Sequence, residues 1–153
     1  MKQGLADAAV LGSPFDFLGK KMGFVVLARA YELFSYPTGG LAASVKKIRE
    51  RPDESKRVIK AGIKASRYIH QNHEGTIQVM MEWLKIDKEM ATATYESTSK
   101  AFSEDGTIPE DGLRLVIDEA KTSANLQRQV LFSDVADLSI LKEAQKELGI
   151  KGR

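Results

Sequence analysis

The sequence predicts an α/β fold, in which a βαβ unit at the N-terminus is followed by a mostly helical C-terminal part. Two short apolar runs, Ala8 to Leu11 and Phe24 to Ala28, flank a helix-like segment from Phe15 to Met22. Such continuous apolar runs suit strands that are covered on both faces, as in parallel sheets. Strand, helix and strand in this order are the outline of a βαβ unit. After Ser44, apolar residues recur at helical spacing instead.

The turn before the first predicted helix is a candidate ligand site. It consists of Gly12, Ser13 and Pro14. Ser13 is predicted to N-cap the helix, and Pro14 fits the first helical position. A helix that begins at the carboxyl end of a parallel strand directs free N–H groups into a crevice, where small anions and polar ligands bind. Most turns of this kind bind nothing, so an ordinary helix start is the alternative interpretation.

Capping and breaking residues divide the rest of the chain into helices. Residues 36–40 form a break, because a proline and two glycines favour backbone angles unsuited to strands and helices. Ser44 and Asp137 are predicted N-caps, Pro52 a helix start and Gly149 a C-terminal stop. We expect helices over residues 45–51, 52 to 71 or 72, a shorter segment that includes 77–84, residues 88–102, a segment that begins at 109, and residues 138–148.

Composition excludes several functional classes. The chain has 153 residues, of which 42% are hydrophobic, which is about one domain's worth and enough to bury a core. Its net charge of +2 argues against a dedicated nucleic-acid binder. The absence of cysteine excludes disulfides, thiolate catalysis and zinc held by Cys. The longest apolar stretches fall short of the ~20 residues that a membrane-spanning helix needs.

The N-terminus lacks the pattern of a secretory signal. Asp7 would fall inside the apolar core of such a signal, so we predict no signal peptide in this chain. The first predicted strand also follows Met1 closely. We therefore expect the sequence to begin in the middle of a larger protein.

Several stretches resemble bacterial solute-binding proteins of the nitrate, sulfonate, taurine and thiamine-precursor type. The resemblance covers essentially all 153 residues and is distributed rather than concentrated in one diagnostic motif. It is carried by GLADAAVL at residues 4–11 with Ser13-Pro14-Phe15, Arg51-Pro52-Asp53 leading to ASRYI at 65–69 and Asn72, the segment from Phe102 to Leu113, and DVADL at 134–138.

This resemblance implies part of a two-lobed type II periplasmic-binding-protein fold. In that family, two α/β lobes are joined by crossing strands, a small solute binds between them, and the loaded protein docks on a membrane transporter. Residues 1–36 would be the end of the second lobe, 37–43 the interlobe crossing, and 44–153 C-terminal helices that pack on a first lobe absent from this sequence. The full-length protein would be periplasmic, or lipid-anchored and extracellular, and this chain its C-terminal fragment.

The resemblance also assigns ligand-binding residues in two groups: Ser13, Pro14 and Phe15 facing the cleft, and Tyr36, Gly39 and Gly40 near the return crossing. N–H groups at the helix start would hold an anionic group, while Phe15 would stack on a flat ligand or, alternatively, pack in the core. The glycines would form a hinge, allow close approach of the backbone to a ligand, or belong to an ordinary loop. We expect a small polar or anionic organic solute of the sulfonate, nitrate, aromatic-acid or pyrimidine class, without a cofactor or metal.

Three charged patterns have both a functional and a plain interpretation. His70 and His73 have a spacing that suits a shared metal but lack a third ligand, so we interpret them as dipole-compensating or surface residues. A basic stripe is predicted to be a solvated face rather than a contact with a membrane or an acidic partner; it consists of Lys56, Lys60, Lys64 and Arg67. Helix-start and loop chemistry explains an acidic group that lacks calcium-loop spacing: Glu104, Asp105, Glu110 and Asp111.

The sequence therefore predicts a binding protein and not an enzyme. It has no nucleophile elbow with a Ser-His-Asp order, no glycine-rich phosphate loop and no thiol. We expect the solute-binding component of an ABC importer, with the solute and the transporter permease as partners of the full-length protein, and self-association of the fragment. A non-catalytic helical interaction module is the main alternative. A thiamine-pyrimidine synthase-like enzyme is a weaker one, because those enzymes use a cysteine-rich motif that this chain lacks.

Overall fold

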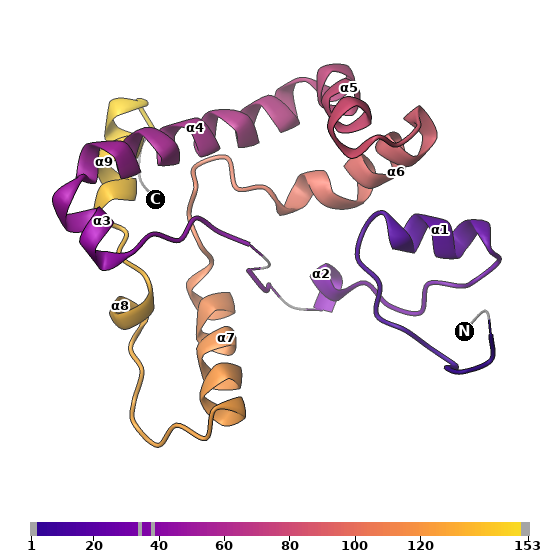
Figure 1. The fold of residues 1–153 in the computed structure, drawn as a ribbon, viewed down its shortest axis with the longest axis horizontal. Coiled ribbons are helices and arrows are strands. Elements are labelled where there is room, and N and C mark those ends of the chain that lie inside the picture. The colour runs from indigo at the N-terminus through magenta and orange to yellow at the C-terminus, as the bar shows by residue number, and fades with distance from the viewer. Residues whose placement is uncertain (1–2, 34, 38, 151–153) are drawn as a thin grey trace. The chain divides into compact units, whose positions relative to one another are not determined.

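In the computed structural model, which describes residues 3–33, 35–37 and 39–150, every regular element is a helix (Figure 1). The described residues form two compact units, which we call unit 1 (within residues 1–28 and 68–102) and unit 2 (within 29–67 and 103–153). The elements are α1 (Phe15–Lys21), α2 (Ala30–Leu33), α3 (Val45–Glu50), α4 (Pro52–Gln71), α5 (His73–Leu84), α6 (Lys88–Thr98), a 3-10 turn (Ser99–Ala101), α7 (Glu110–Ser123), α8 (Phe132–Val135) and α9 (Ser139–Glu147).

The predicted α/β fold is wrong, because the described residues contain no strand and no sheet. The helix of the predicted βαβ unit is present as α1, but the runs Ala8 to Leu11 and Phe24 to Ala28 lie outside any helix or strand. Their side chains face solvent, and Val25 and Leu27 are 80% and 84% exposed. A strand needs a hydrogen-bonded neighbour and cover for its apolar face, and the described residues provide neither here. The division at residues 36 and 43 stays a prediction.

Local capping signals place the longer helices of the C-terminal part as predicted. Ser44 caps α3, since its Oγ accepts a hydrogen bond of 3.1 Å from the backbone N–H of Lys47. Asp137 was predicted to be the N-cap of the last helix, but Leu138 occupies that position; the carboxylate of Asp137, one residue earlier, accepts from the backbone N–H of Ser139 at 2.9 Å. Gly149 follows α9 with a φ of +68°, which is the left-handed conformation that ends many helices. The four-residue helices α2 and α8 were not predicted.

Unit 1 is built on the packing of α5 against α6, with α1 also in contact with α6. Ile77 of α5 and Ala91 of α6 are fully buried at this contact. The hydroxyl of Tyr95 donates to the backbone carbonyl of Ile69 at 2.9 Å and so joins α6 to the last turn of α4. The core of unit 1 is therefore small.

Unit 2 is centred on the loop between the 3-10 turn and α7. Gly106 in this loop has a φ of +79°, and a Cβ built on it would lie 3.0 Å from Leu141 Cδ1 and 3.1 Å from Ile63 Cγ1. Both Leu141 of α9 and Ile63 of α4 are buried. The buried side chain of Gln145 donates through Nε2 to the carbonyl of Asp105 at 2.8 Å. The loop thus packs its backbone directly against α4 and α9.

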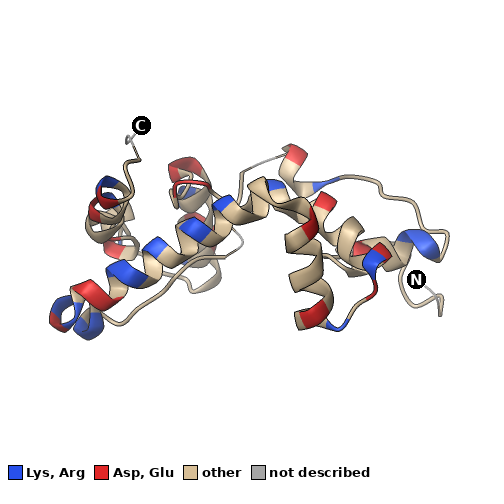
Figure 2. Cartoon of the chain, turned by 90° about the horizontal axis from the view of Figure 1, so that it is seen from above, with Lys and Arg blue, Asp and Glu red and all other residues tan. Residues whose placement is uncertain are grey.

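An ion-pair network joins α4 to α9 beside this loop. Lys56 Nζ lies 3.1 Å from Glu143 Oε2 and 3.0 Å from Glu147 Oε1, and Lys60 Nζ lies 2.6 Å from Glu147 Oε2. Hydrogen bonds from Lys60 and Lys56 lower the pKa of Glu147. The lysines belong to the basic residues that Figure 2 shows along α4. Their predicted role as a solvated face is wrong for Lys56, whose side chain is 18% exposed and paired.

We predict that Gly106→Ala destabilises unit 2 by about 1–3 kcal/mol, because an L-residue disfavours this φ and the added Cβ crowds Leu141 and Ile63. Urea unfolding followed by circular dichroism measures the effect. Gly149→Ala is the matched control, since Gly149 also has a positive φ but a Cβ there meets nothing within 4 Å. Equal losses in the two variants would show that the contacts of Gly106 with the buried side chains are unimportant.

We also predict that the contact of α9 with α4 weakens in acid. The pKa of Glu147 is lowered in the fold, so its contribution to stability is complete above the ordinary value of 4.5 and is lost as the pH falls through the lowered value. Amide hydrogen exchange along α9, corrected for the intrinsic pH dependence, measures this change. Glu147→Gln should reduce protection at neutral pH and remove most of the acid step, whereas Glu96→Gln in unit 1 should do neither. An unaltered acid step in Glu147→Gln would contradict the prediction.

Candidate functional site

Ser13 does not cap α1, so that part of the predicted site is wrong. Pro14 occupies the N-cap position without a side-chain hydrogen bond. Ser13 Oγ instead donates to Asp16 Oδ1 at 3.0 Å and lies 2.5 Å from Ser97 Oγ of α6. Ser97 Oγ also donates to the carbonyl of Thr94 at 3.0 Å. Ser13 and Ser97 have one hydroxyl proton each, so they can donate only two hydrogen bonds at a time among these three contacts. The contact between the two serines links the turn before α1 to α6.

Thr94 adds a buried hydroxyl to this cluster. Its Oγ1 is, among the described residues, a buried side-chain oxygen without a hydrogen-bond partner. Leaving such a group unpaired costs about 1–3 kcal/mol. Because Thr94 is only 6% exposed, a ligand reaches this oxygen only after a local opening of the structure.

Phe15 lies at the start of α1 and is 61% exposed. The alternative interpretation as a core residue is therefore wrong. An exposed ring beside the Ser13 cluster offers a face for stacking on a flat ligand. Pro14, next to it, is half-buried.

The second predicted group, Tyr36, Gly39 and Gly40, belongs to unit 2, whereas Ser13, Pro14 and Phe15 belong to unit 1. The hydroxyl of Tyr36 donates to Glu119 Oε2 at 3.1 Å, and this hydrogen bond raises the pKa of Tyr36. A Cβ at Gly39 or Gly40 would meet nothing within 4 Å. No other described part of the protein approaches these two glycines closely enough to require the absence of a side chain. Both therefore fit the interpretation as an ordinary loop.

The described part of the chain holds no group of three or more His, Cys, Asp or Glu side chains that could hold a metal ion. One ring nitrogen of His70 lies 2.8 Å from the carbonyl of Phe102. His73 Nδ1 lies 3.2 Å from Glu74 Oε1, and its ring packs edge-to-face on Tyr95. His70 is in the last turn of α4, as predicted, but His73 begins α5. No helix in the described ranges is both long enough and apolar enough to cross a membrane.

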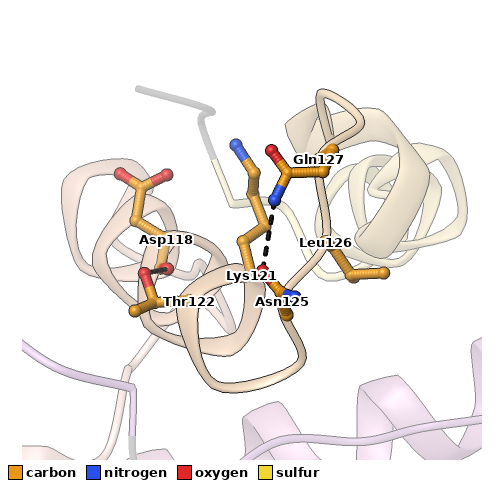
Figure 3. A pocket seen from close by; sticks show the side chains of 6 residues that line it. All are labelled: Asp118, Lys121, Thr122, Asn125, Leu126 and Gln127. Carbon is orange, nitrogen blue, oxygen red and sulfur yellow. Dashed lines mark hydrogen bonds between the residues drawn. The ribbon is translucent and has the colours of Figure 1, made fainter.

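Two grooves lie on α7, and of their lining residues the sequence analysis singled out only Glu110. The larger, of about 580 Å³, is lined by α7 and residues 129–133, and the smaller, of about 350 Å³, by the end of α7 and residues 125–127 (Figure 3). Asp118 and Lys121, three residues apart on α7, line both grooves. In the sequence these two charges are indistinguishable from an ordinary solvated helix face. None of the predicted site residues lines either groove.

The chain matches no protein-family model, no curated protein and no solved structure. The similarity to solute-binding proteins therefore rests on the stretches of sequence quoted above.

Proposed function

We propose that this chain is a non-catalytic binding protein, the solute-binding component of an ABC importer, and that it acts outside the cytoplasmic membrane while bound to another polypeptide. The resemblance along the whole sequence supports the importer and the solute class. The distribution of apolar side chains supports the association with another polypeptide.

The exposed apolar surface of unit 1 is the observation that carries this proposal. Leu27 after α1 and Trp83 of α5 are each 84% exposed, and Val79, one turn before Trp83, is also exposed. Large apolar patches are rare on soluble monomers and mark interfaces. On the C-terminal helices Val58 and Leu84 are also exposed, whereas Ile77 is buried.

A helical interaction module without a solute is the second candidate. The all-helical fold favours it, because a helical chain with uncovered apolar faces needs only a partner and no ligand cleft. The two candidates share the interface and differ in whether a small molecule binds at the start of α1.

We predict that a sulfonate, nitrate, aromatic acid or pyrimidine raises the unfolding temperature of the protein. The sample is the tagged chain, isolated from its native host together with the polypeptides that remain bound to it. Ligand that binds only the folded state raises the unfolding temperature, by the equivalent of about 2.7 kcal/mol at one hundred times Kd. Phe15→Ala should weaken the best ligand by up to about tenfold through loss of stacking. Ser13→Ala should weaken it as well, because the hydroxyl cluster loses one donor.

Two substitutions serve as controls for this thermal-shift measurement. Tyr31→Ala removes an aromatic ring of nearly equal exposure in unit 2, and Ser35→Ala removes the hydroxyl of an exposed serine that lines neither groove. Both should leave the shift unchanged. If none of the four solute classes stabilises a preparation that retains its bound polypeptides, the importer function is refuted in favour of the interaction module.

We further predict that the isolated chain does not remain a monomer at micromolar concentration, because its apolar faces cover one another. Sedimentation velocity should show oligomers, and a dye for apolar surface should bind. Trp83→Gln and Leu27→Gln should each shift the distribution toward monomer, while Leu115→Gln on α7, an exposed apolar position of unit 2, should not. A compact monomer that binds no dye would show that the apolar surface of unit 1 is not an interface.

A further inference from the structure

The side chains of Asp118 and Lys121 are charged groups without an ion-pair partner among the described residues. Their charged neighbours are paired: Arg114 Nη2 lies 2.6 Å from Glu110 Oε1, and Arg128 Nη1 lies 4.0 Å from Asp134 Oδ2. Figure 3 shows the carboxylate of Asp118 and the ammonium of Lys121 extending to the same side of α7. The larger groove is thus lined by two acids and two bases, of which Glu110 and Arg114 pair with each other while Asp118 and Lys121 have no ion-pair partner among the described residues.

Apolar side chains line the larger groove together with these two charges. This apolar wall is formed by Val130, Leu131 and Phe132, and the buried Ile117 of α7 completes it. Leu131 is half exposed, so the wall is open to solvent on the groove side. A side chain of moderate size that lies on this wall is removed from water and is stabilised in proportion to the apolar area it buries.

The chain that forms the groove is fixed at both ends. Asn125, with a φ of +49°, turns the chain at the end of α7, and the N–H of Leu126 donates to the carbonyl of Lys121 at 2.9 Å. Gln127 Nε2 donates to Asn125 Oδ1 at 3.1 Å. At the other end, the N–H of Leu131 donates to Asp134 Oδ2 at 3.0 Å, where α8 begins. The groove wall is thus held by hydrogen bonds before any ligand binds.

We propose that the groove between α7 and residues 129–133 binds a zwitterionic amino acid with an apolar side chain. The ammonium group of the ligand pairs with Asp118, its carboxylate pairs with Lys121, and its side chain lies on the wall of Val130, Leu131 and Phe132. A volume of about 580 Å³ is within the range of small-molecule sites. This site lies in unit 2, is separate from the Ser13 cluster and does not rest on the proposed function.

Charge complementarity selects a zwitterion over a simple ion. A simple anion that pairs with Lys121 is repelled by the adjacent Asp118, and a simple cation that pairs with Asp118 is repelled by Lys121. Arg114 does not change this balance, because Glu110 is its main partner and Asp118 affects it least among its charged neighbours. A ligand that carries both charges gains both pairings and meets neither repulsion.

The test compares three ligands with the same side chain and different charged groups: L-phenylalanine, N-acetyl-L-phenylalanine, which lacks the ammonium, and L-phenylalaninamide, which lacks the carboxylate. Binding to the full chain is followed by backbone amide shifts of α7 and residues 125–133 in NMR titrations. L-Phenylalanine should bind about tenfold more tightly than either analogue. Asp118→Asn should abolish its advantage over the N-acetyl compound, and Lys121→Gln its advantage over the amide.

The matched controls are Lys142→Gln, which removes an exposed lysine of α9, and Glu96→Gln, which removes an exposed acid of α6. Neither should change the order of the three ligands. A structural role of Asp118 or Lys121 would weaken all three ligands alike and would leave their order intact. Equal binding of the three ligands, an unchanged order in both variants, or no shift with millimolar L-phenylalanine would each overturn the proposal.

Discussion

The close approach of the Gly106 backbone to Ile63 and Leu141 is the contact on which unit 2 depends. The turn that makes it possible is set locally, because Asp105 Oδ1 accepts from Ser103 Oγ at 2.8 Å and from the backbone N–H of Thr107 at 2.9 Å. Glycine is the residue that adopts the positive φ of position 106 without strain and also leaves space for the buried side chains of Ile63 and Leu141. The lysine–glutamate pairs between α4 and α9 act on the same joint, but exposed pairs contribute little by themselves. Packing therefore determines how the Gly106 loop, α4 and α9 contact one another, and the ion pairs change the stability of this contact only slightly.

Unit 1 has no comparable centre, and this difference bears on function. Its buried apolar side chains are few, and hydrogen bonds of Tyr95 and Ser13 supplement the packing of α5 against α6. Its largest apolar side chains, above all Trp83 and Leu27, lie outside this core. A chain that places its aromatic and aliphatic area on the outside gains stability by covering that area with another surface. Both proposed functions share this requirement.

The sequence predicted those parts of the fold that are decided within one or two helical turns. Ser44, Asp137 and Gly149 act through hydrogen bonds and backbone angles of their immediate neighbours, so the helix ends near them were predictable. The apolar runs 8–11 and 24–28 were misread as strands, because an apolar run reveals burial tendency and not the presence of a pairing strand. The pairing of Lys56 with Glu143, 87 residues away, and of Ser13 with Ser97 are long-range contacts that no local pattern encodes.

The two candidate sites differ in what a ligand must displace. At the Ser13 cluster, the hydroxyls of Ser13 and Ser97 already bond to protein groups, so a ligand there competes with contacts that join α1 to α6. On α7, Asp118 and Lys121 line the grooves and have no ion-pair partner among the described residues, so a ligand there breaks no ion pair of theirs. Binding at Ser13 is therefore coupled to the packing of unit 1 and to whatever covers its apolar surface. Binding on α7 has no such coupling, because the groove is held by the hydrogen bonds of its own loop.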